Sequence, residues 1–252
     1  MSGLAVITGA SRGIGRAVAD QLARDGYDIA VGYFARADAA LEVVEAVVAE
    51  RGVRAAAYQV DVRSPESCHR LVVDARAAMG PVRAIVSNAT GFGADHPGLG
   101  ASLSVPVAVY QEMFAARLGA LLSLVDAAGG DLDGGGRVVA VTSTGTHRHV
   151  PGYAPIAASM AAVESVVRYL AAELGPRGIT VNTAVGGVID TDALAEITAD
   201  PERLKEAVRR ATPLGRVGRT DDIAAVVSFL CSTSAGWVTG QSLIADGGNS
   251  LR

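Results

Sequence analysis

The sequence predicts a doubly wound α/β fold: a single parallel sheet of about seven strands with helices on both faces. The run at 4–7 is short and wholly apolar, which is typical of a strand buried on both faces of a parallel sheet. A glycine-rich turn and a helical pattern follow it at once. Apolar runs then alternate with helical patterns through short connections as far as the C-terminus. We expect one domain over 1–252, because 50% hydrophobic residues suffice for a large core.

The composition excludes several classes of protein. A net charge of −4 without basic tracts argues against nucleic acid as a partner. No apolar run reaches the length of a membrane span, and the first strand starts almost at Met1, so we expect neither a membrane segment nor a signal peptide. Cys68 and Cys231 are too few for a disulfide framework, which favours the cytoplasm. We expect no metal site, since no carboxylate or cysteine accompanies the histidines at ligand spacing.

The turn after the first strand carries three glycines, Gly9, Gly13 and Gly15. Glycine at these points lets the backbone bend sharply, approach a pyrophosphate and pack the helix start against the strand. The helix N-terminus then presents free N–H groups to the phosphates. The alternative is an ordinary glycine-rich turn, but a preceding strand and a following helix are the context that a nucleotide site requires. The fold expected is therefore of the Rossmann type.

The second strand, 27–33, ends without the acid that holds the adenosine ribose of NAD. Instead the chain continues through Arg36, and Arg12 in the glycine turn supplies a second cation. Arginine at this place accommodates the extra phosphate of NADP. Two solvated arginines are the alternative, yet the missing acid favours NADP(H) by itself.

The remaining elements are predicted from periodicity and from their end signals. The helix at 37–51 stops at Gly52, and Ser64 and Pro65 begin a helix that reaches residue 79. We expect strands at 55–60, 81–87, 137–142, 180–185 and 241–245, and helices at 107–128, 201–210 and 221–231. The loop at 91–106, with Asp95, His96 and Pro97, should border the substrate. The long segment 186–218 is interpreted as a substrate lid.

The spacing Thr-Gly-x-x-x-Gly-x-Gly at 8–15 resembles the short-chain dehydrogenase/reductase family. The resemblance implies that the cofactor touches the turn, the ends of later strands and the segment after the sixth strand. The residues that it places on the cofactor are Gly9, Ser11, Arg12, Gly13, Ile14, Gly15, Arg36, Asp61, Val62, Asn88, Ala89, Met160, Ile189 and Thr191. Asp61 is expected at the adenine, and Ile189 and Thr191 at the nicotinamide carboxamide and the diphosphate.

The catalytic segment departs from the usual family pattern. Ser143 ends the fifth strand, where the family keeps a serine for the reacting oxygen. Ala-Ser-Met-Ala-Ala-Val-Glu at 158–164 resembles the segment with the catalytic lysine, so Met160 stands at the lysine position and Ile156 at the usual tyrosine position. Tyr153, with six residues between it and Met160, instead resembles the Tyr-x6-Lys motif of the enoyl-acyl carrier protein reductase branch. The flanks at 186–194, 212–216 and 246–251 resemble its NADPH-dependent type III form.

Met160 removes a charge, because a thioether is only a weak acceptor. Lys205 is the only lysine among the 22 basic residues, and all the others are arginine. A general replacement of lysine in this chain would therefore give arginine at position 160 and does not explain a methionine. An engineered substitution is the alternative. Alignment of the helix at 107–128 places Arg117 where the family has an asparagine, unless the alignment slips by a residue. We therefore take Tyr153, Ser143 and Arg117 as the candidate catalytic groups.

The predicted function is NADPH-dependent reduction of an enoyl thioester, with coenzyme A or a carrier protein as the acyl carrier and an atypical, weakened site. A redox-silent member that binds NADP(H) as a sensor or scaffold, or performs non-redox chemistry, is the alternative. Loop histidines His96, His147 and His149 are more often solvated than catalytic. The resemblance also implies a homo-oligomer, a tetramer or a dimer.

Overall fold

The computed structural model describes residues 3–91, 100–192, 194 and 200–251. Seven strands form one sheet in the order β3-β2-β1-β4-β5-β6-β7, and every pair is parallel. The strands are β1 Gly3–Ile7, β2 Tyr27–Tyr33, β3 Ala55–Gln59, β4 Val82–Ser87, β5 Arg137–Ser143, β6 Thr180–Gly186 and β7 Ser242–Ala245. The doubly wound fold of about seven strands is therefore confirmed.

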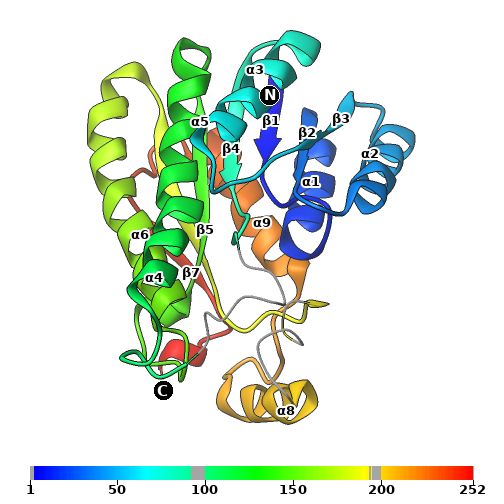
Figure 1. The fold of residues 1–252 in the computed structure, drawn as a ribbon. Helices are drawn as coiled ribbons and strands as arrows, with labels where there is room; N and C mark the ends of the chain where they lie inside the picture. Colours follow the sequence, from blue (N-terminus) through cyan, green and yellow to red (C-terminus); the bar gives the residue numbers. More distant parts are fainter. Residues whose placement is uncertain (1–2, 92–99, 193, 195–199, 252) are drawn as a thin grey trace.

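Helices cover both faces of the sheet (Figure 1). One face packs against α3 (Pro65–Met79), α5 (Ala120–Ala128) and α6 (Ala154–Leu174), and the other against α1 (Gly13–Arg24), α2 (Ala37–Arg51) and α9 (Thr220–Cys231). The strand order reverses between β1 and β4, and in open α/β sheets ligands bind outside the carboxyl ends of the strands at such a point. The glycine turn lies at this position.

The signals that predicted helix ends act locally in the structure. The Ser64 hydroxyl oxygen accepts a hydrogen bond of 3.1 Å from the Ser67 N–H at the start of α3. Gly52 closes α2 with a φ of +68°, in the left-handed region that favours glycine. Such ends depend on neighbours in sequence, which is why they could be predicted.

The helix expected at 107–128 is interrupted. It consists of α4 (Val107–Phe114), a π-helical turn at Ala115–Gly119 and α5, so the prediction of one regular helix was wrong in its middle. π-turns are rare and frequent at functional sites, and this one carries Arg117. The stretch Val107–Leu132 is long and apolar enough to cross a membrane, but here it covers the sheet as a core helix would.

Two expected substrate elements are only partly described. α8 (Pro201–Ala211) confirms the helix predicted inside 186–218, and Lys205 Nζ ties it to Asp190 at 2.7 Å. Residues 193 and 195–199 of the predicted lid lie outside the described residues, and its role as a lid stays a prediction. Asp95, His96 and Pro97 also lie outside them.

Candidate active site

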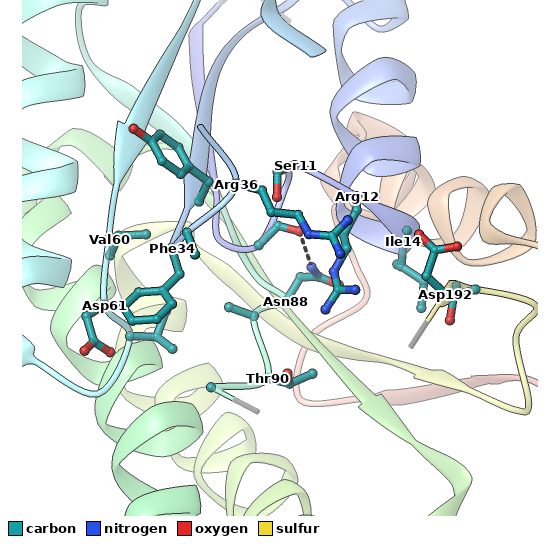
Figure 2. A pocket seen from close by; sticks show the side chains of 18 of the residues that line it. Ser11, Arg12, Ile14, Phe34, Arg36, Val60, Asp61, Asn88, Thr90 and Asp192 are labelled. Carbon is teal, nitrogen blue, oxygen red and sulfur yellow. Dashed lines mark hydrogen bonds between the residues drawn. The ribbon is translucent and has the colours of Figure 1, made fainter. Parts of the chain in front are cut away.

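The glycine turn after β1 is held by close backbone packing. Gly9 and Gly13 have φ angles of +66° and +56°, which favour glycine. A Cβ on Gly15 would lie 2.2 Å from the Gly9 carbonyl oxygen, so no side chain fits there. From the end of β4, Asn88 Nδ2 donates to the carbonyl oxygens of Thr8 and Gly9 at 3.0 and 3.2 Å. Figure 2 draws the bond to Gly9 as a dashed line. Close backbone packing and the Asn88 amide thus fix the path of the turn.

The N-terminus of α1 is suited to an anion. Arg12 occupies the capping position with extended φ and ψ angles of −153° and 171°, and its side chain makes no capping hydrogen bond. The first turn also contains no acidic residue. The N–H groups of the helix start and the positive end of its dipole are therefore available to phosphate oxygens.

A cavity of about 510 Å³ runs from this turn to the ends of β2 and β3. Most of the predicted cofactor residues line it: Gly9, Ser11, Arg12, Gly13, Ile14, Arg36, Asp61, Val62, Asn88, Ala89 and Thr191. Three do not, namely Gly15, Met160 and Ile189. Gly15 lies behind the cavity wall, where its missing side chain lets the start of α1 pack closely against Gly9.

Arg12 and Arg36 come from different elements and reach the same end of the cavity. Arg12 follows the glycine turn, and Arg36 lies between β2 and α2. Figure 2 shows the two guanidinium groups beside each other over the cavity. The two guanidinium groups bring positive charge to this end of the cavity. No acidic residue stands between the end of β2 and Arg36 to neutralise it, so this end is suited to a phosphate monoester.

Sequence reasoning missed the partner of Asp61. Arg63 donates from Nε to Oδ1 and from Nη2 to Oδ2 of Asp61, both at 2.9 Å, and its backbone N–H also donates to Oδ1. These hydrogen bonds lower the pKa of Asp61. Since a carboxylate has about four acceptor positions, Oδ2 keeps one for a ligand. Arg63 also reaches Glu112 of α4 at 3.2 Å.

Phe34 is the second cavity residue that the prediction did not include. Its ring is 55% exposed, and the Arg63 guanidinium lies 5.2 Å from the ring centre. An exposed aromatic side chain directly after β2 was the signal available in the sequence. The ring lines the cavity together with Asp61 and Val62, at the end expected to hold the adenine.

Ser143 and Tyr153 are brought together through a glycine. The Gly145 N–H donates to Ser143 Oγ at 3.2 Å in the short 3-10 helix η3 (Thr144–Thr146). A Cβ on Gly145 would lie 2.8 Å from Cδ1 and Cε1 of Tyr153 and 3.6 Å from Ser143 Oγ. The ring of Tyr153, just before α6, therefore rests against the backbone that carries Ser143.

Met160 lies in an apolar cluster rather than along the 510 Å³ cavity. It is 6% exposed and packs with Met113 and Ile156, and Tyr153 covers the cluster from outside. The position expected for a lysine thus holds a buried thioether. A contact of Met160 with the cofactor stays a prediction.

Arg117 faces this same region from the π-helical turn. It is 5% exposed, and its Nε has no hydrogen-bond partner within the described part of the chain. Desolvation lowers the pKa of Arg117, and its electrostatic interaction with Tyr153 opposes that shift. The guanidinium is thus buried, on a turn that packs against the helix that Tyr153 precedes.

Of the two cofactor residues predicted in the segment after β6, only Thr191 lines the cavity. Its methyl group lies 3.7 Å from where a Cβ of Gly13 would be. Ile189 is 8% exposed, packs into the core and pairs with Gly218.

The loop histidines His147 and His149 are both exposed, and His147 Nε2 lies 3.3 Å from Oε2 of the buried Glu164.

A parallel sheet that reverses its order beside a glycine turn defines the class of dinucleotide-binding α/β proteins. Comparison with protein families then narrows the class. The family model described as Enoyl-(Acyl carrier protein) reductase matches residues 9–250. The chain belongs to this family and is an oxidoreductase of the short-chain dehydrogenase/reductase type.

Similar proteins of known name or structure match over nearly the full length. The chain is 36% identical to 1-cyclohexenylcarbonyl-CoA reductase of Streptomyces collinus, covering 98% of this chain and 87% of that protein. A blue fluorescent protein from a metagenomic library, solved with NADPH, superposes with a TM-score of 0.89 at 35% identity, covering 98% of both chains. A short-chain dehydrogenase from Burkholderia cenocepacia, solved with NADP, has a TM-score of 0.89 at 33% identity, also covering 98% of both.

Proposed function

We propose that the protein is an NADPH-dependent reductase of an enoyl thioester. The observation that carries the proposal is that Ser143 and Tyr153 meet at Gly145, while the buried guanidinium of Arg117 interacts electrostatically with Tyr153. Two oxygen donors and a fixed cation in one place suit a reaction in which negative charge develops on a carbonyl oxygen. The similarity to a CoA-thioester reductase supports an acyl thioester as the substrate.

The residues present fit NADP(H). The uncapped start of α1 would hold the diphosphate, Arg12 and Arg36 the 2′-phosphate, and Phe34 with Asp61 the adenine. The two solved neighbours that contain NADPH and NADP support the choice of cofactor. When bound, NADPH supplies the hydride.

The side chains of the site act on the thioester. Hydride addition at the β-carbon shifts the electron pair of the double bond, so that an enolate oxygen forms. Tyr153 and Ser143 would donate hydrogen bonds to that oxygen, and Arg117 would lower its energy by charge. A proton taken up from solvent water at the α-carbon completes the reduction, so that one hydride and one proton are added and no group leaves. Arg117 does not deliver that proton, because a guanidinium does not readily release one.

A second candidate is favoured by Met160. A buried thioether cannot replace an ammonium group, and the cluster with Met113 and Ile156 gives the residue a structural role. In this case the chain binds NADP(H) without turnover, as a sensor or scaffold, or uses the cleft for non-redox chemistry.

Assembly and location are part of the proposal. Trp237 is fully exposed, and Phe229, Leu243 and Ile244 are each about 40% exposed along α9 and β7. Exposed apolar residues gathered at a sheet edge are typical of a protein interface. We propose a homo-oligomer, a dimer or tetramer, in the cytoplasm, with coenzyme A or a carrier protein as the acyl carrier.

Anaerobic consumption of NADPH with short enoyl thioesters tests the proposal, with 3-oxoacyl thioesters in parallel and Tyr153→Phe as the control enzyme. We expect slow consumption with the enoyl compounds that the control loses. Tight NADPH binding without any consumption would favour the second candidate. Consumption with 3-oxoacyl compounds alone would reject the enoyl assignment.

A further inference from the structure

Glu164 is a buried carboxylate that the proposed reaction does not use. It lies on α6, one helical turn after Met160, is 5% exposed, and points toward β5. Burial of a carboxylate is unfavourable unless hydrogen-bond donors or a cation compensate for the lost water. The donors that do so here reveal what the residue holds.

Among the described residues, the two hydroxyl donors and the one histidine that lie against this carboxylate come from the residues around Ser143. Thr142 and Thr146 place their hydroxyls 2.9 Å from Glu164 Oε1. His147 Nε2 lies 3.3 Å from Oε2. The Glu164 carboxylate on α6 thus contacts Thr142, which precedes Ser143, and Thr146 and His147 at the end of η3.

The network continues to the backbone of Ser143. The Thr146 hydroxyl lies 2.9 Å from the Ser143 carbonyl oxygen as well as from Glu164. Within the same short helix, the Gly145 N–H donates to Ser143 Oγ, and the Tyr153 ring rests on Gly145. A shift of η3 would therefore move Ser143 relative to Tyr153.

We propose that Glu164 is a positioning residue, which through Thr146 and His147 holds η3 so that Ser143 and Tyr153 share one site. The inference rests on the proposed reduction at these two residues. Because Met160 leaves no ammonium in the cluster beside Tyr153, the relative placement of the remaining donors gains importance. The network reaches across elements that are 18 and 22 residues apart in the chain.

Three variants test the role kinetically. Glu164→Gln keeps the side-chain shape but removes the charge and one acceptor, and Thr146→Val removes one hydroxyl at constant shape. We expect each to lower kcat by up to about a hundredfold, the effect of a small misplacement of reacting groups, with the Kd for NADPH unchanged. Thr146→Ser restores the hydroxyl and should restore kcat. Glu173→Gln, on the exposed surface of the same helix, is the matched control.

Hydrogen–deuterium exchange of the full-length protein provides a readout that needs no substrate. Glu164→Gln should speed exchange of the Gly145 and His147 amides, whose hydrogen bonds lie inside η3. Unchanged kcat in Glu164→Gln and Thr146→Val overturns the inference, as does a loss that Thr146→Ser shares. If the unmodified protein reduces no thioester, the proposed function fails, and exchange alone decides: faster exchange at these amides supports the inference, and unchanged exchange overturns it.

Discussion

Arg117 and Tyr153 come from elements that pack against each other, the π-helical turn at Ala115–Gly119 and the start of α6, and electrostatic interaction with Tyr153 opposes the lowering of the Arg117 pKa by burial. Arg117 is a buried cation, and no described residue accepts a hydrogen bond from its Nε. A charge in such a place is costly unless something compensates for it. A developing enolate oxygen beside Tyr153 would be such a partner. Four predictions concern this pair and the cofactor cavity.

The first prediction concerns the positive charge that is missing at Met160 and the positive charge that Arg117 adds. Met160→Lys should raise kcat, because it restores an ammonium group beside Tyr153. If the two cations crowd each other, the gain should appear only together with Arg117→Asn, since contacting residues are not additive. Single-turnover rates of the four enzymes measure this coupling. Met160→Leu, which adds no charge, is the control, and no gain in either background would contradict the prediction.

The second prediction concerns the hydroxyl of Tyr153. Tyr153→Phe keeps the ring on Gly145 and should lower the rate by about 10²–10³, as the loss of one oxyanion donor does. Binding of NADPH, followed by fluorescence, should not change. Tyr169→Phe, at a residue that is 68% exposed on α6, should have no effect. An unchanged rate in Tyr153→Phe would move the chemistry to another donor, with His147 and His149 next to test.

The third prediction concerns the choice between NADPH and NADH. Arg36→Asp should reduce the preference for NADPH, because a 2′-phosphate would then meet a negative charge at this end of the cavity. Fluorescence titration with both reduced cofactors gives the ratio of Kd values. The same change at Arg70, exposed on α3, should leave the ratio unaltered. Equal or tighter binding of NADH by the unmodified protein would refute the assignment.

The fourth prediction concerns the packing of the glycine turn. Gly15→Ala places a methyl group 2.2 Å from the Gly9 carbonyl oxygen, so the start of α1 must move. We expect a loss of about 1–3 kcal/mol in the free energy of unfolding, typical of overpacking, together with loss of NADPH binding. Gly175→Ala is the control, because its φ of −52° and the open space around it accept a Cβ. Urea unfolding compares the two, and equal losses would contradict the prediction.

The sequence by itself determined the parallel sheet, the positions of its strands and the nucleotide-binding turn. These features depend on local rules, because glycine at positive φ, a capping serine such as Ser64 and the periods of apolar residues act within a few positions. The spacing of Tyr153 from Met160 also needed only the chain order. Most of the predicted cofactor residues line one cavity because they follow the carboxyl ends of parallel strands, which meet at the same edge of the sheet.

Only the tertiary structure decided which side chains meet. Glu164 joins Thr142 across 22 residues, and Arg63 meets Glu112 across 49. The π-helical turn at 115–119 is not visible in the apolar pattern, and the structure buries Arg117 on it, where that turn packs against α6. Such contacts depend on how whole elements pack against each other, and no local pattern in the chain specifies the relative placement of two helices and a strand.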